Sequence, residues 1–432
     1  MSITSPTSSE QVYLDLYEGK TLLIKAGGAE MMPEKRLILA QTINMFIRNG
    51  IFVTLVFGGQ PQIDEHCDAQ NDEPRLKVDG IGITNPELLH QAVLPAYTSL
   101  CEAIAKEIPE LDVMPPSTIR CQQDWESGFV GYPVHHKGLD DLQNKAIGFV
   151  GQNSSEQNFN VNADNVVAYL ASEFGSSIDE VILLTKKGGV TNQKDELVPL
   201  ILSSDINNDG THKTIAVTDG MVQKLKSVRK MLPKAGKVAM TTVEKLYQEI
   251  TDWKGGGTLC IDVDQLECSK MRPEEVKIFL PIYDALIAQG IFKKRNHQDT
   301  QEVFDEHNIL RINDSPLGGF SLIEQDEKWS ELSTLWAGYL GNGVGKLLSI
   351  QWIKQFCESE SEFLYALSMV ADPDDAEARQ KVLKRFTQYG MQNFGPVSEA
   401  NTMGLPNSLL YYDTTERDPY LLKYQSTFHL DL

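Results

Sequence analysis

The chain has 432 residues, which suggests two or three domains at roughly 100–200 residues each. Its formal net charge is -21, from 60 acidic and 39 basic residues. A charge of this sign argues against binding of nucleic acid or anionic membrane through a basic face. Hydrophobic residues make up 41%, as in a globular protein, and no apolar run reaches the roughly 18 residues that span a bilayer. We therefore expect a cytoplasmic protein without a nucleic-acid or membrane partner.

The first residues and the cysteines support the same assignment. Residues 1–11 are rich in Ser and Thr and lack the basic and apolar regions of a signal peptide, so we expect residues 1–18 to form a loose tail. The six cysteines are scattered and show no metal-ligand spacing. In a chain without a secretion signal they are most simply reduced thiols, and we expect no metal site.

Over the first two thirds of the chain, short apolar runs alternate with helical patterns. The expected strands lie at 21–28, 51–59, 181–189, 237–241 and 257–263, and the expected helices at 37–50, 162–175, 221–232 and 243–251. Strands that alternate with helices imply a mainly parallel sheet covered on both faces, which is a three-layer α/β sandwich. We assign this domain to residues 19–265.

The pattern restarts after a short polar junction at 260–272, so a second, smaller α+β domain is assigned to residues 266–432. Its expected helices lie at 274–290, 344–356 and 375–390, and its expected strands at 309–313, 318–325, 329–337 and 362–370.

A glycine-rich turn joins the strand at 329–337 to the following helix. It consists of Gly341, Asn342, Gly343, Val344, Gly345 and Lys346. Free N–H groups at a helix N-terminus favour an anion, and glycines let the backbone approach a pyrophosphate closely. An ordinary strand-to-helix turn is the alternative reading.

This order of elements resembles the GNAT-type acetyltransferase fold, whose coenzyme-A loop has the pattern Arg/Gln-x-x-Gly-x-Gly/Ala. The glycines match, and Leu340 stands at the leading position. The resemblance implies that the backbone amides of the turn bind acetyl-CoA. It also implies that strand amides around Leu335 and Trp336 polarise the thioester carbonyl.

Two segments resemble, more specifically, the transferase domain of bacterial N-acetylglutamate synthases. Residues 289–296 correspond to that family's Gly-Ile-Leu-Val-Arg-Arg-Ser, and residues 326–331 to its Glu-Glu-Lys-x-Gly-Glu. The resemblance implies transfer of an acetyl group from acetyl-CoA to L-glutamate, the first step of arginine biosynthesis.

The residues fit this chemistry. An amine attacks a thioester only as the free base, and Glu331 is the candidate that removes its proton. The two substrate carboxylates need cations. The candidate cations are Lys294, Arg295, Lys328 and Arg417. Each of these charged residues could instead be a solvated surface residue, and aspartate would fit the same cations.

Five ordered segments of the first domain resemble the amino-acid kinase family, and acetylglutamate kinase in particular. They lie at 24–28, 57–64, 78–84, 160–164 and 220–224. The residues implied to neutralise, orient or cradle phosphate, or to belong to these motifs, are Lys25, Gly27, Gly28, Gly58, Gly59, Asn160, Asp164 and Lys224. Gln60 replaces a motif glycine and Gly82 replaces an arginine, so the site is either an ATP/Mg-dependent kinase site or a vestige. In a purely structural role, the two lysines pair with Asp164.

In synthases of this architecture the kinase-like domain is implied to bind arginine as a feedback inhibitor, around residues 254–258. A tight turn into a strand is the alternative there. The resemblance also implies a homo-oligomer. The preferred hypothesis is thus an amino-acid N-acetyltransferase with a regulatory kinase-like domain. The alternatives are a bifunctional synthase/kinase or acetylglutamate kinase, and a non-catalytic sensor of arginine or acetyl-CoA.

Overall fold

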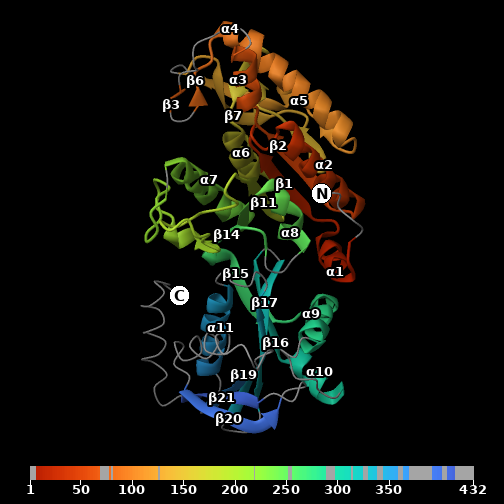
Figure 1. The fold of residues 1–432 in the computed structure, drawn as a ribbon, viewed down its shortest axis with the longest axis vertical. Helices are drawn as coiled ribbons and strands as arrows, with labels where there is room; N and C mark the ends of the chain where they lie inside the picture. Colours follow the sequence, from red (N-terminus) through yellow and green to blue (C-terminus); the bar gives the residue numbers. More distant parts are fainter. Residues whose placement is uncertain are drawn as a thin grey trace. The chain divides into compact units, whose positions relative to one another are not determined.

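The computed structural model describes most of the chain (Figure 1). The described residues are 6–68, 77–78, 81–124, 127–217, 219–251, 255–288, 297–312, 315–324, 329–337, 344–358, 363–368, 392–400 and 406–413. The chain divides into two compact units, Met1–Gln265 and Leu266–Leu432.

The first unit is built on an eight-stranded sheet in the order β12-β14-β13-β11-β1-β2-β8-β5. Neighbouring strands run parallel, except that β13 and β14 are antiparallel. The strands are β1 Thr21–Ala26, β2 Phe52–Phe57, β5 Asp112–Val113, β8 Lys145–Ile147, β11 Glu180–Leu184, β12 Leu200–Leu202, β13 Lys237–Thr241 and β14 Thr258–Ile261.

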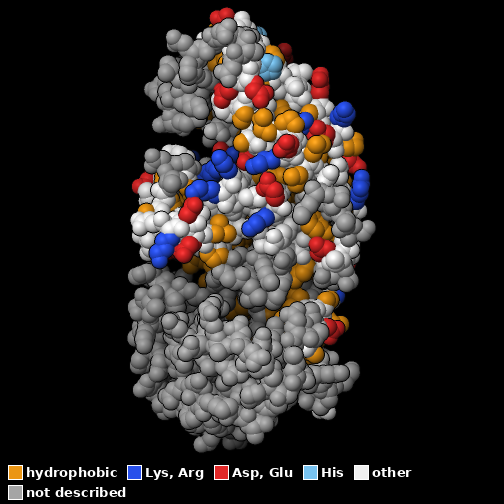
Figure 2. Space-filling model, in the orientation of Figure 1, with side chains coloured by type: hydrophobic (Ala, Val, Ile, Leu, Met, Phe, Trp, Pro, Cys, Tyr) orange, Lys and Arg blue, Asp and Glu red, His pale blue; other side chains and the backbone are white. Residues whose placement is uncertain are grey.

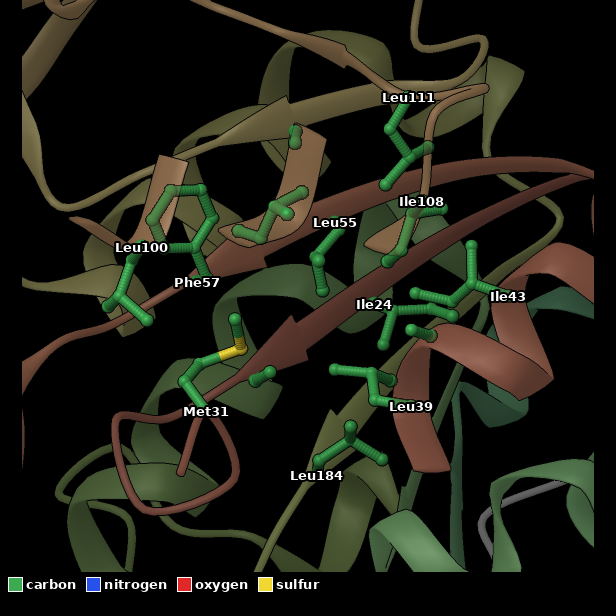
Figure 3. Packing of buried hydrophobic residues seen from close by; sticks show 14 of the residues in the cluster. Ile24, Met31, Leu39, Ile43, Leu55, Phe57, Leu100, Ile108, Leu111 and Leu184 are labelled. Carbon is green, nitrogen blue, oxygen red and sulfur yellow. The ribbon is translucent and has the colours of Figure 1, made fainter. Parts of the chain in front are cut away.

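Helices cover both faces of this sheet. All residues of β1 are buried, and alternate side chains enter different cores: Leu22 and Ile24 pack on one face, and Leu23 packs on the other. Figure 3 shows Ile24 facing Leu39 and Ile43 of α2 in the first core. The helices are α1 Ser8–Tyr17, α2 Pro33–Arg48, α3 Gln60–Asp68, α4 Pro86–Leu88, α5 Leu94–Glu107, α6 Ala163–Phe174, α7 Asp219–Ala235 and α8 Leu246–Thr251.

Smaller elements complete the first unit. Four strands, β6 Ile119–Asp124, β7 Val130–His136, β9 Val150–Gln152 and β10 Asn158–Val161, close a small barrel in the order β10-β7-β6-β9. The strands β3 Lys77–Val78 and β4 Ile81–Gly82 pair with each other. Short helical turns lie at Leu89–Val93, Pro116–Thr118, Gly175–Ser177, Ser203–Asp205, Val243–Lys245, Val263–Gln265 and, in the second unit, Pro273–Glu275.

The expected loose tail at residues 1–18 is wrong for its second half, which forms α1. Thr7 and Glu10 make a capping box: the Thr7 hydroxyl accepts from the Glu10 N–H at 3.3 Å, and the Glu10 carboxylate accepts from the Thr7 N–H at 2.7 Å. Leu14 is fully buried, so the helix is anchored to the first core. One of the Thr residues that suggested a loose tail, Thr7, is the N-cap of this helix.

The second unit contains a seven-stranded sheet in the order β15-β16-β17-β18-β19-β21-β20. Neighbouring strands are antiparallel, except that β18 and β19 are parallel. Figure 1 shows α11 on one side of this sheet and α9 and α10 on the other. The elements are β15 Leu266–Lys270, α9 Val276–Ala288, α10 His297–Asp305, β16 His307–Ile312, β17 Ser315–Glu324, β18 Trp329–Ala337, α11 Val344–Glu358, β19 Phe363–Ser368, β20 Gln392–Ala400 and β21 Pro406–Asp413.

The boundary between the two units, Gln265 to Leu266, falls inside the junction expected at 260–272, but this segment is not a polar loop. Cys260 lies inside β14, and residues 266–270 form β15, the first strand of the second sheet, which pairs antiparallel with β16. Its side chains are only partly buried, as expected for an edge strand, so its apolar pattern is weak. The strands β20 and β21 were not expected, and the helix expected at 375–390 lies outside the described residues.

Candidate functional site

Two glycine turns meet at the carboxyl edge of the first unit's sheet. Gly27 and Gly28 follow β1, and Gly58 and Gly59 follow β2, its parallel neighbour. A Cβ added at Gly28 would lie 2.5 Å from the backbone nitrogen of Gln60, and one added at Gly58 would lie 3.4 Å from the backbone nitrogen of Gly28. A side chain at Gly28 would therefore force the two turns apart, whereas a Cβ at Gly58 would make only an ordinary contact. Ligands of open α/β sheets bind at this edge.

Charged side chains converge beside these turns. Lys25 Nζ lies 2.9 Å from Asp164 Oδ1, and Asp164 belongs to the first turn of α6. Burial and the nearby Lys25 lower the pKa of Lys224 on α7, whereas Asp164 and Glu30 oppose that shift. Figure 2 shows Lys and Arg side chains gathered in the region of α7. The structure thus brings together three of the charged residues named from the kinase motifs.

Three other residues of the kinase motifs have structural explanations. The Asn160 side chain donates to Thr84 Oγ1 at 3.2 Å and belongs to the barrel strand β10. A Cβ added at Gly59 would lie 2.3 Å from the ring of Phe149, so packing alone requires glycine there. The amide of Gln60 donates to Asp64 within α3, at 2.6 Å.

In the second unit, the candidate base lies where two parallel strands separate. Glu331 of β18 is half-buried and stands opposite Ile323 of β17 and Tyr365 of β19. Among the described residues of these two strands, β19 pairs with β18 only from Trp329 to Glu331. Beyond Glu331, the described residues show no strand paired with that edge of β18.

A β-bulge follows on the same strand. The pairing with β17 shifts between Gly319 and Ser321, and Thr334 has a φ of 47°, a left-handed conformation rarely adopted by a β-branched residue. Leu335 and Trp336, whose amides are the candidate donors to a thioester carbonyl, come directly after it. The bulge therefore sets the direction of the backbone N–H groups at these two candidate positions.

The expected coenzyme turn is described only at its end. Val344, Gly345 and Lys346 form the first turn of α11, so their backbone N–H groups stand at a helix N-terminus. The rest of that turn and the candidate substrate cations lie outside the described residues: Gly341, Asn342, Gly343, Lys294, Arg295, Lys328 and Arg417. Their roles stay predictions.

A buried charged cluster that the sequence did not reveal lies in the first unit. Lys237 Nζ is 2.8 Å from Glu180 Oε2, and the Tyr17 hydroxyl donates to the same carboxylate oxygen at 2.7 Å. Burial, reinforced by the Glu180 charge, raises the pKa of Glu249 to about 8. The Glu249 carboxylate accepts from the Gly256 N–H, in the turn before β14. Among the residues that the structure describes, no group of three His, Cys, Asp or Glu side chains could hold a metal ion.

The profile of the amino acid kinase family matches residues 20–240, more than half of the chain. The chain belongs to the amino acid kinase family. Its relatives in that family include the chloroplastic acetylglutamate kinase of Arabidopsis thaliana, 26% identical over 57% of this chain and 77% of that protein. Another is the mitochondrial protein arg11 of Schizosaccharomyces pombe, 27% identical over 60% of this chain but only 31% of that protein.

Solved structures extend the likeness beyond the kinase-family segment. The N-acetylglutamate synthase of Neisseria gonorrhoeae, complexed with coenzyme A and L-arginine, covers 94% of this chain with a TM-score of 0.62 and 16% identity. In complex with coenzyme A and N-acetyl-glutamate, the same enzyme gives a TM-score of 0.54 and 17% identity, with 97% of that chain covered. The likeness confirms the expected fold class: an amino-acid-kinase-type α/β sandwich followed by a smaller α+β unit.

Across the described residues, no helix is both long and apolar enough to cross a membrane.

Proposed function

We propose that this protein is an amino-acid N-acetyltransferase that converts acetyl-CoA and L-glutamate to CoA and N-acetyl-L-glutamate, the first step of arginine biosynthesis. The observation that carries the proposal is the fold likeness, over 94% of the chain, to a synthase solved with coenzyme A and N-acetyl-glutamate. The transferase domain is residues 266–432 and the kinase-like domain is residues 19–265.

The second unit supplies the parts that acetyl transfer needs. The first turn of α11 offers backbone N–H groups to the coenzyme diphosphate, and β18 beyond Glu331 is the strand along which its extended arm would lie. Glu331 stands at the last described pair of β18 with β19 and can take the proton of the attacking ammonium group. The amides after the bulge at Thr334 can stabilise the oxyanion that forms on the thioester carbonyl.

Thiol release tests the proposal directly. Purified full-length protein is given acetyl-CoA and L-glutamate, with a chromogenic thiol reagent to detect CoA and mass spectrometry to detect N-acetylglutamate. We expect release that depends on glutamate, with L-aspartate as the comparison acceptor. A folded protein that binds no acetyl-CoA and releases no thiol would refute the function.

A bifunctional synthase/kinase is the second candidate, because Lys25, Asp164 and Lys224 remain assembled beside two glycine turns. If the site transfers phosphate, ATP and N-acetylglutamate should yield ADP. Lys25→Met should then abolish ADP formation, because the phosphate charge loses a neutralising cation, and should leave thiol release unchanged. Thiol release without ADP formation would mean that the kinase-like site is vestigial. No product in either assay would favour a non-catalytic sensor.

We further propose that L-arginine regulates the enzyme by binding at the cluster formed by Tyr17, Glu180, Lys237 and Glu249. A guanidinium group carries five N–H donors. Glu249 offers a buried carboxyl group, and Glu180 Oε1 is buried without a hydrogen-bond partner among the described residues. The cluster adjoins the turn at 255–258, inside the segment expected to hold arginine.

Arginine binding at this cluster should release a proton. Because the pKa of Glu249 is about 8, most of this carboxyl group is protonated at pH 7, and a guanidinium cation placed against it favours the charged form. Calorimetric titrations at pH 7 in two buffers of different ionisation enthalpy should give a release approaching one proton per arginine. Glu249→Gln should abolish both the release and the binding, and arginine binding to that variant with wild-type affinity would exclude this site.

The proposed enzyme is a cytoplasmic homo-oligomer, as the resemblance to bacterial synthases implies. Light scattering on the full chain tests the assembly, and a monomer at working concentrations would contradict it.

A further inference from the structure

A chain of buried polar side chains runs across the second sheet to the bulge of β18. Trp336 Nε1 lies 2.9 Å from His307 Nε2, and His307 Nδ1 lies 2.8 Å from Ser321 Oγ. Ser321 Oγ lies 2.8 Å from Thr334 Oγ1 and 2.9 Å from the carbonyl oxygen of Val303. We call the four side chains the His307 network; they are His307, Ser321, Thr334 and Trp336.

The contacts determine the direction of every hydrogen bond in this network. An indole nitrogen only donates, so His307 Nε2 must accept from Trp336 and the imidazole proton lies on Nδ1. The Nδ1–H group then donates to Ser321 at 2.8 Å, with Thr334 Oγ1 a second and longer acceptor at 3.4 Å, and the Ser321 hydroxyl donates to the Val303 carbonyl. The hydroxyl of Thr334 is left to donate to Ser321 Oγ. Burial lowers the pKa of His307 to about 3, so the imidazole stays neutral at physiological pH.

The surroundings preserve this arrangement. A Cβ added at Gly319 would lie 2.5 Å from His307 Nε2 and 2.8 Å from Trp336 Nε1, so a side chain there would occupy the bond between them. The ring of Phe279, from α9, stacks on His307 with centroids 4.0 Å apart. His307 and Ser321 have no exposed surface, and Thr334 is 9% exposed.

The network reaches the one strand position of β18 whose backbone is strained. A non-glycine residue in the left-handed conformation costs about 1–2 kcal/mol and persists only where its surroundings hold it. Thr334 and Trp336 are the chain neighbours of Leu335, and the network holds both of them. The Thr334 hydroxyl is hydrogen-bonded to Ser321, and the Trp336 indole is hydrogen-bonded to His307.

We propose that the His307 network positions the acetyl-transfer strand: it holds the bulge at Thr334 in the shape that aims the following backbone amides at the thioester carbonyl. The inference rests on the proposed acetyltransferase function. None of the four side chains needs to touch the substrate. They act through the backbone, where a misplacement of about 1 Å costs on the order of a hundredfold in rate.

Substitutions at Thr334 separate positioning from stability. Thr334→Gly removes the hydroxyl, and glycine can adopt a φ of 47° without strain but is not held there, so the melting temperature should stay close to that of the wild type while the bulge samples other shapes. The turnover number should nevertheless fall by about tenfold to a hundredfold, with a much smaller change in KM for acetyl-CoA. Thr334→Ser keeps the hydroxyl and is the matched control, with turnover near wild type.

A spectroscopic readout reports the amides themselves. Acetyl-CoA labelled with ¹³C at the thioester carbonyl is bound without an acceptor, and its carbonyl stretch is measured by infrared difference spectroscopy. Wild-type protein should shift the band to lower frequency, Thr334→Ser should do the same, and Thr334→Gly should shift it less. His307→Gln keeps a side-chain oxygen that can accept from the Trp336 indole, whereas His307→Phe has no acceptor. The band shift of His307→Gln should therefore lie between those of the wild type and of His307→Phe.

The negative outcomes for the function and for the network are distinct. Wild-type protein that neither binds acetyl-CoA nor shifts the band refutes the proposed function and, with it, this inference. Wild-type protein that shifts the band while Thr334→Gly shifts it equally, with unchanged turnover, overturns the role of the network alone. A loss in Thr334→Gly that Thr334→Ser does not rescue also overturns it.

Discussion

Replacement of Glu331 by glutamine should lower turnover by a factor of about 10² to 10⁴ and leave acetyl-CoA affinity near wild type. Glutamine has almost the same shape but cannot take a proton from the substrate ammonium group. The backbone of Glu331 pairs on both sides, with Ile323 and Tyr365, so the strand should keep its place in the variant. Steady-state thiol release gives the turnover, and calorimetry gives the acetyl-CoA affinity.

A matched control lies on the neighbouring strand. Glu324 is an exposed carboxylate of β17 that pairs through its backbone with Ser330, so Glu324→Gln makes the same chemical change one pair away. It should keep wild-type turnover. Activity of Glu331→Gln should also recover partly at higher pH, where more substrate amine is already deprotonated in solution. Equal losses in turnover and affinity, with no such recovery, would assign Glu331 to binding rather than proton transfer.

The fold class followed from the sequence because its central strands are short apolar runs that end in glycine. β1 and β2 are buried on both faces, so their runs are nearly continuous, and the glycines that end them are needed where the two turns meet. β15 lacks this signal because it is an edge strand of partly exposed side chains. The start of helix α1 does not show in the overall composition, because it depends on the spacing of Thr7 and Glu10, which form a capping box.

The site was less predictable, since its members meet only through strand register. Glu331 and the turn before α11 could be named because they lie in local motifs. His307 and Trp336 are 29 residues apart, and they meet because both pair with β17, His307 opposite Ser321 and Trp336 opposite Gly319. No local pattern encodes that meeting. The buried charged cluster does leave a signal in the sequence. Each of two apolar strands begins with a charged residue, Glu180 in β11 and Lys237 in β13.

Loss of the buried lysine should be the largest single effect on stability. The Lys237 and Glu180 side chains are 1% and 0% exposed, so Lys237→Met leaves a buried carboxylate whose only described donor is the Tyr17 hydroxyl. Breaking a buried ion pair from one side costs about 3–5 kcal/mol, whereas exchanging both charges for apolar groups is often nearly neutral. We therefore expect urea unfolding of Lys237→Met to show a loss of that size, and Glu180→Leu/Lys237→Met to recover most of it.

The neighbouring pair supplies the comparison that makes this loss interpretable. Lys20 Nζ lies 3.8 Å from Asp179, with side chains 24% and 30% exposed, so water already solvates both charges. Lys20→Met should cost no more than about 1 kcal/mol. A Lys237→Met variant as stable as Lys20→Met would mean that water reaches Glu180, and the cluster proposed to hold arginine would then not be a dry, preformed site.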